Sequence, residues 1–139
     1  MLAVAWLQRR RVPLPEPKPL VDESLEAGYG RLSIVCELPR SAAHRHLWEG
    51  TVPAISIDGA APVDVIWGTW SQWAGTAGAS KFVLPVGTHQ FRIDVRPGSL
   101  QVDYKSIDGD VETTSQRVYR FRYEAPKVPT FTGMLVRLR

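Results

Sequence analysis

Strict alternation of apolar and polar residues is the feature that most limits how this chain can fold. It is clearest over residues 89–96, where His89, Phe91, Ile93 and Val95 alternate with polar side chains. Because successive side chains of a β-strand point to opposite faces, this pattern predicts a strand with one buried face. An amphipathic helix would instead need apolar residues spaced by three and four positions.

The same alternation recurs along the chain between residues that favour turns. Asp58-Gly59 predicts a tight hairpin turn, because both residue types accept positive φ angles. A second pair, Asp108-Gly109, predicts another turn after a strand over 100–104. The alternating apolar positions of the other predicted strands are Leu32, Ile34, Cys36 and Leu38; Ile55 and Ile57; Val63, Val65 and Trp67; Phe82 and Leu84; Tyr119, Phe121 and Tyr123; and Met134, Val136 and Leu138.

This spacing of strands and turns predicts an all-β fold. With 11 prolines and 11 glycines in 139 residues, little room is left for helix. A chain of this length supports one hydrophobic core and is too short for two ordinary domains. We therefore expect an antiparallel β-sandwich of about seven or eight strands, immunoglobulin-like in its patterning, with a small barrel as the alternative.

Three segments of the chain differ in composition. Residues 1–11 are apolar and then basic, residues 12–27 begin with four prolines in nine positions, and residues 28–139 carry the strand pattern. We expect a short N-terminal segment, an extended Pro-rich linker and a single sandwich domain. In residues 1–11 the basic residues follow the apolar run, the reverse of a secretory signal peptide, so none is predicted. This segment is interpreted as a frayed terminus or as a weak membrane association, the remnant of an anchor.

Cys36 is the only cysteine of the chain, so no disulfide can form within it. Its position on the apolar face of a predicted strand indicates a buried, inert thiol. A reducing compartment or the membrane-proximal cytoplasmic side is therefore favoured. No nucleotide-binding motif occurs, and no cofactor is expected.

Two short motifs resemble the PEGA-type β-sandwich module. They are Ile-Ser-Ile-Asp-Gly at residues 55–59 and Leu-Pro-Val-Gly-Thr-His at residues 84–89, and the resemblance covers residues 54–96. Such modules place an Asp-Gly strand end before a Leu-Pro-x-Gly-x-His strand start. The resemblance implies a PEGA-like sandwich and a non-catalytic accessory module, often associated with the cell envelope.

No catalytic motif is present, and the chain is predicted not to be an enzyme. Glu37 with Glu49, or Asp58 with Asp64, are acidic pairs that could act as acid and base, but Asp58 is explained by its turn.

Metal binding is considered for one pair of histidines. His44 and His46 would point the same way on a strand and could chelate a metal, with Cys36 or His89 as a third ligand. An exposed loop between strands is the preferred interpretation, so no metal site is predicted.

Three tryptophans within seven residues, Trp67, Trp70 and Trp73, are the strongest candidates for contact with a protein partner. In the alternative interpretation, Trp67 and one other tryptophan pack into the core or cap its open end.

The basic C-terminal region is the second candidate for binding. Arg120, Arg122, Arg137 and Arg139 could form a cationic strip for an anionic ligand if their strands are neighbours. The alternative is a solvated strand face that prevents edge-to-edge pairing. We therefore predict a non-enzymatic module that binds a protein partner, with an anionic ligand (lipid or nucleic acid) or a carbohydrate as the alternative. Nucleic acid is the least expected of these, and the sequence does not indicate an oligomeric state.

Overall fold

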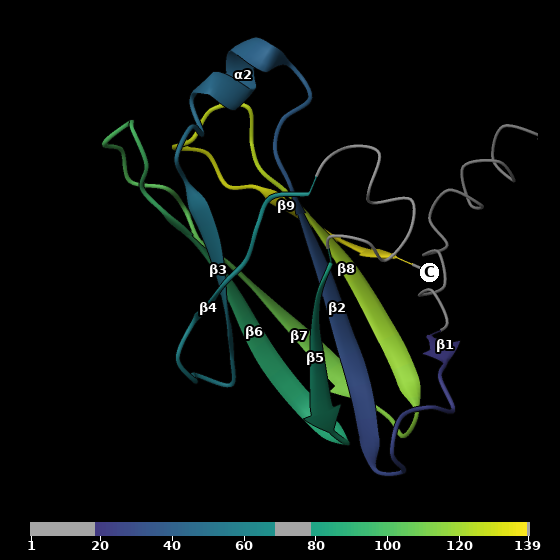
Figure 1. The fold of residues 1–139 in the computed structure, drawn as a ribbon. Helices are drawn as coiled ribbons and strands as arrows, with labels where there is room; N and C mark the ends of the chain where they lie inside the picture. Colours follow the sequence, from purple (N-terminus) through teal and green to yellow (C-terminus); the bar gives the residue numbers. More distant parts are fainter. Residues whose placement is uncertain (1–18, 69–78, 139) are drawn as a thin grey trace, which may run out of the picture.

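The computed structural model describes residues 19–68 and 79–138, which form two packed β-sheets (Figure 1). The predicted all-β sandwich is confirmed. The described elements are β1 (Leu20–Val21), β2 (Tyr29–Glu37), the helix α2 (Ala42–His46), β3 (Val52–Ile57), β4 (Val63–Asp64), β5 (Ser80–Pro85), β6 (Gly87–Arg96), β7 (Ile107–Thr113), β8 (Arg117–Glu124) and β9 (Met134–Leu138). The predicted closing strand over residues 134–138 is thus present.

The strands are divided between two sheets, which we call sheet A and sheet B. In sheet A, β2 and β8 are neighbours, β5 pairs with the other side of β2, and both β1 and β9 pair with the far edge of β8. Sheet B has the order β4-β3-β6-β7. The described strand pairs are antiparallel except β2 with β8, which is parallel. This one parallel pair brings the carboxyl ends of two neighbouring strands to the same end of the sandwich (Figure 1).

The hydrophobic core lies between the sheets and uses the predicted inward faces of β2, β3, β6 and β8. The predicted face of β9 is wrong, because Met134 is 58% exposed and Leu135, which is paired with Tyr123, packs against the core. Phe91 of β6 meets Phe121 of β8 edge-on, with ring centroids 5.1 Å apart. Full burial of each such side chain contributes about 1.5–3 kcal/mol. The other buried core residues of the strands include Leu32, Ile34, Cys36, Ile55, Ile93, Val95, Val111, Tyr119 and Tyr123.

Two predictions about the segment between β6 and β8 are wrong. Residues 97–106 form a loop, so there is no strand over 100–104. Asp108-Gly109 is not a turn, because it lies within β7, where Gly109 is paired with Phe91. A Cβ atom on Gly109 would lie 2.4 Å from Cζ of Phe91. Glycine is therefore required here by close packing of an aromatic ring, and not by a positive φ angle.

The first Asp-Gly pair does form the predicted hairpin turn. The φ angles of Asp58 and Gly59 are 52° and 73°, and the N–H of Ala60 donates to the carbonyl of Ile57 over 2.9 Å. Positive φ at both central residues is the turn geometry whose twist matches that of the flanking strands.

A buried histidine connects this turn to the next one. Nδ1 of His89 lies 2.6 Å from Oδ2 of Asp58, and Nε2 lies 2.6 Å from the carbonyl oxygen of Pro85. Both ring nitrogens face acceptors, which favours the doubly protonated imidazolium. The hydrogen bond with Asp58 is the main cause that raises the pKa of His89, and the same hydrogen bond lowers the pKa of Asp58. We call these three residues the histidine clasp.

The clasp joins residues of the two motifs that resemble the PEGA-type module. The resemblance itself remains a prediction.

The packed part of the chain begins upstream of Gly28. Leu20 and Val21 pair with β8, and Leu25 is buried. The last part of the expected linker, residues 19–27, is thus in contact with the sandwich, whereas residues 1–11 lie outside the described residues. Within the described part of the chain, no helix is long and apolar enough to cross a membrane.

Candidate functional site

A group of aromatic residues fixes the position of α2 at one end of the sandwich. Trp48, just after the helix, is 2% exposed and lies between Trp67 and Tyr104, at centroid distances of 5.7 Å and 5.0 Å. Oη of Tyr104 donates to the carbonyl of Leu47 over 3.0 Å, and Nε1 of Trp67 donates to the carbonyl of Thr51 over 3.1 Å. Both bonds end on the backbone that follows α2, so the helix is held relative to the strand ends.

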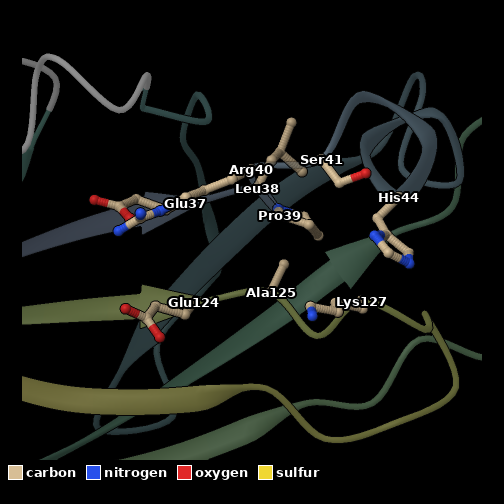
Figure 2. Close-up of a pocket in the computed structure, with 9 residues that line it drawn as sticks. All are labelled: Glu37, Leu38, Pro39, Arg40, Ser41, His44, Glu124, Ala125 and Lys127. Carbon is tan, nitrogen blue, oxygen red and sulfur yellow. The ribbon is translucent and has the colours of Figure 1, made fainter.

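A cleft lies beside α2, at the end of the sandwich where the parallel strands β2 and β8 both end. Glu37 and Glu124 are the last register pair of β2 and β8, and the N–H of Ala125 donates to the carbonyl of Glu37 over 2.9 Å. Beyond this pair, β2 leads through Pro39 to α2, whereas β8 leads into the loop before β9 (Figure 1). The resulting end cleft has a volume of about 430 Å³ (Figure 2). Its lining residues are Glu37, Leu38, Pro39, Arg40, Ser41, His44, Glu124, Ala125 and Lys127.

Glu37 is the most buried charged residue of the end cleft. The residue is 6% exposed, and its Oε1 has no hydrogen-bond partner among the residues that the structure describes. Burial is the main cause that raises the pKa of Glu37. The charges of Arg122 and Arg40 lower this pKa, and the charge of Glu124 raises it further. A buried carboxylate oxygen without a donor is costly, so a ligand that supplies an N–H at this position would bind favourably.

The charged groups of the end cleft are divided between two ends (Figure 2). The carboxyl groups of Glu37 and Glu124 lie at one end, where Nε of Arg122 is 2.9 Å from Oε1 of Glu124. The imidazole of His44 and the ammonium group of Lys127 lie at the other end. Nδ1 of His44 is buried and, within the described part of the chain, has no hydrogen-bond partner. The guanidinium group of Arg40 also lies beside Glu37 in Figure 2, so one end of the cleft combines two carboxylates with two arginines, and the other end carries N–H groups and the Ser41 hydroxyl.

The structure does not support the strand that would align His44 and His46. Both residues lie on α2, where a separation of two residues turns the side chains apart by roughly 200°. His46 is exposed and lies 3.4 Å from Glu49, while His89 is held in the histidine clasp. Among residues 19–68 and 79–138, no group of three or more His, Cys, Asp or Glu residues is placed to hold a metal ion.

Glu49 follows α2 and does not line the end cleft, so it is not brought together with Glu37 there.

Of the three candidate tryptophans, only Trp67 lies in the described part of the chain. Its ring stacks on that of Tyr123, with centroids 6.2 Å apart, and it is partly buried against the core. Trp67 thus covers the end of the core, as in the alternative interpretation of this segment. Trp70 and Trp73 lie outside the described residues.

The candidate arginines do not form one strip. Strands β8 and β9 are neighbours, but Arg137 is paired with Phe121 and so lies on the opposite face from Arg120 and Arg122. The guanidinium of Arg137 lies over the ring of Tyr119, 5.6 Å from its centroid. Arg139 lies outside the described residues.

Sequence reasoning missed the end cleft as a site. In the sequence, Glu37 lies between the apolar positions Cys36 and Leu38, and Pro39 follows directly. Neither residue indicates that a second strand, 87 residues further along, ends beside it. Arg40, Glu124 and Lys127 carry no sequence signal of their own.

A second cavity of similar volume, about 460 Å³, lies on sheet B. Its charged residues, Arg92, Asp108 and Asp110, are exposed, and Arg92 is already bonded to Ser106 over 2.7 Å. It contains no buried polar atom that lacks a partner in the described part of the chain, so we consider the end cleft the better candidate.

Comparison with known proteins places the chain in no family, because no family model, curated protein or solved structure matches it.

Proposed function

We propose that this chain is a non-enzymatic interaction module that binds a short segment of a protein partner in the end cleft. The observation that carries this proposal is the buried Oε1 of Glu37, which lines the cleft and has no donor among the described residues. A hydrogen bond from a partner would remove the cost of that unpaired acceptor. Ligands with few N–H groups would gain less at this position.

The surroundings of the cleft favour an extended ligand. A smaller cavity of about 150 Å³ adjoins the end cleft, shares residues 37–40 with it and is also lined by Trp67. A further cavity shares Leu38, Arg45 and Trp67 with this smaller cavity and runs along α2. Adjoining cavities around one helix suit a peptide segment better than a single compact molecule.

Apolar side chains on the neighbouring loop favour a protein partner. Val128 and Phe131, which follow Lys127 in the loop before β9, are 40% and 64% exposed. Exposed aromatic and aliphatic residues beside a polar cleft are typical anchors of protein interfaces.

The alternative, a binder of anions or carbohydrates, has less support. Arg31 is 2.8 Å from Asp22, and Arg122 is 2.9 Å from Glu124, so part of the basic charge of sheet A is balanced. The indole N–H of Trp67 is bonded to Thr51 and is not available to a sugar hydroxyl.

Peptide selection against the folded chain tests the proposal. Selected peptides are measured on the wild-type chain, on Ser41→Trp, which fills the cleft, and on Thr88→Trp, which places the same bulk on the exposed face of sheet B. We expect Ser41→Trp to abolish binding and Thr88→Trp to leave it unchanged. Equal binding by all three proteins would show that the cleft is not the binding surface.

A further inference from the structure

We infer that the end cleft selects a peptide segment that carries a cationic side chain and a carboxylate on neighbouring residues. The cation would contact Glu37 and Glu124, and the carboxylate would contact Lys127 and His44. This inference rests on the proposed function and adds the chemical class of the partner segment.

The case for a cation begins with two carboxylates on adjacent strands. Glu37 and Glu124 share one face of sheet A at the last register pair of β2 and β8, so their like charges lie close together. Arg122 is in direct contact with Glu124, at 2.9 Å, and the guanidinium group of Arg40 lies beside Glu37 in Figure 2. Oε1 of Glu37 is nevertheless a buried acceptor without a hydrogen-bond partner in the described part of the chain. A lysine or arginine side chain supplies the missing N–H as a charge-assisted hydrogen bond.

The other end of the cleft has the complementary character. Lys127 is exposed and contributes an ammonium group, and the buried Nδ1 of His44 lacks a hydrogen-bond partner among the described residues. In Figure 2 both groups lie at the opposite end of the cleft from the carboxyl groups of Glu37 and Glu124. A carboxylate can accept hydrogen bonds from both, provided that His44 carries its proton on Nδ1.

An apolar surface separates the two ends. Pro39 and Ala125 are both buried and lie between the acidic and basic groups in Figure 2. Water is displaced from such a surface by the aliphatic part of a long side chain, which strengthens the ionic contacts at either end. Neutral peptides would gain only this apolar contact.

The test uses short peptides of equal length whose two central residues are Lys-Glu, Gln-Glu, Lys-Gln or Gln-Gln, with blocked termini. A further peptide with a free C-terminal lysine distinguishes a terminal carboxylate from a side-chain one. Affinities are measured by calorimetry for the wild-type chain, Glu37→Gln and Lys127→Gln. The matched controls, Glu112→Gln and Lys81→Gln, make the same chemical changes at exposed residues outside the cleft.

We expect the Lys-Glu peptide to bind best and to lose about tenfold or more in affinity with Glu37→Gln, but not with Glu112→Gln. The Gln-Glu peptide should be insensitive to Glu37→Gln, because the cation is already absent. If Glu37→Gln does not fold, the four peptides on the wild-type chain still give the comparison.

Two results would contradict the inference in different ways. If the Gln-Gln peptide binds as well as the Lys-Glu peptide, and Ser41→Trp abolishes both, the cleft binds peptides but does not select these charges. If, at millimolar concentration, no peptide binds the wild-type chain more tightly than it binds Ser41→Trp, the proposed function is wrong as well.

Discussion

Replacing His89 by leucine removes both hydrogen bonds of the histidine clasp and keeps a side chain of similar size on the buried face of β6. The carbonyl of Pro85 retains one donor, because Oγ1 of Thr113 lies 2.8 Å away. The variant therefore loses the charged hydrogen bonds of the ring without leaving that carbonyl unpaired. A hydrogen bond that involves a charged group contributes about 1.5–3 kcal/mol, so we expect the free energy of unfolding to fall by roughly 2–3 kcal/mol.

The size of this loss depends on pH in a defined direction. The hydrogen bond with Asp58 raises the pKa of His89 above its usual value of 6.5 in the folded state. The contribution of His89 is therefore complete below pH 6.5 and is lost as the pH rises through the folded-state pKa. The pKa of Asp58 is lowered from 3.8, so its contribution is present above that pH and is lost as the pH falls through the folded-state pKa. The destabilisation by His89→Leu should therefore be largest between the folded-state pKa of Asp58 and the folded-state pKa of His89.

Urea unfolding at about pH 5.5 and about pH 9, followed by tryptophan fluorescence, measures the difference. We expect the gap between wild type and His89→Leu to shrink at the higher pH. Asp58→Asn is the control, since asparagine tolerates the φ angle of 52° and can still accept the N–H of Gln90. In that background, His89→Leu should have a smaller effect that depends less on pH, because only the bond to Pro85 remains. A gap in the wild-type background that stays constant between the two pH values would refute the charged clasp.

Three further variants and measurements test the packing. Gly109→Ala should lower the free energy of unfolding by about 1–3 kcal/mol, because its Cβ would meet the ring of Phe91; an unchanged melting temperature would contradict this. Cys36 is 1% exposed, and burial raises the pKa of its thiol to about 12, so it should react with a thiol reagent only after unfolding in urea; rapid reaction in the folded chain would contradict that burial. Trp67→Phe should cost about 1 kcal/mol through loss of the bond to Thr51, and Trp67→Ala about 3 kcal/mol; an alanine variant as stable as wild type would show that Trp67 does not close the core.

The strands that could be predicted from the sequence are those whose pattern is local. Period-two alternation identifies the buried face of β6 and β8 without knowledge of their partners. The two Asp-Gly pairs show the limit of such reasoning. Asp58-Gly59 forms a turn, whereas Gly109 lies in a strand because the ring of Phe91 occupies the space of its side chain. That requirement comes from a neighbouring strand and leaves no trace in the local sequence.

The candidate site could not be predicted for a related reason. Glu37 and Glu124 meet only because β2 and β8 run parallel, and no local pattern reveals a parallel pairing between distant strands. The faces on which the arginines lie also depend on strand register, which the local sequence does not reveal. The antiparallel pairing of β8 with β9 places Arg137 opposite Phe121, on the face away from Arg120 and Arg122. A shift of one residue would have brought these arginines together.

Whether the end cleft is the binding surface is tested most directly by mapping amide chemical shifts of the ¹⁵N-labelled chain during titration with the Lys-Glu peptide. We expect the largest changes at Ser41, His44, Ala125 and Lys127, which line the cleft, and little change at Glu112 on sheet B. Changes concentrated on sheet B, or an unchanged spectrum at millimolar peptide, would contradict the proposal that this cleft binds a partner.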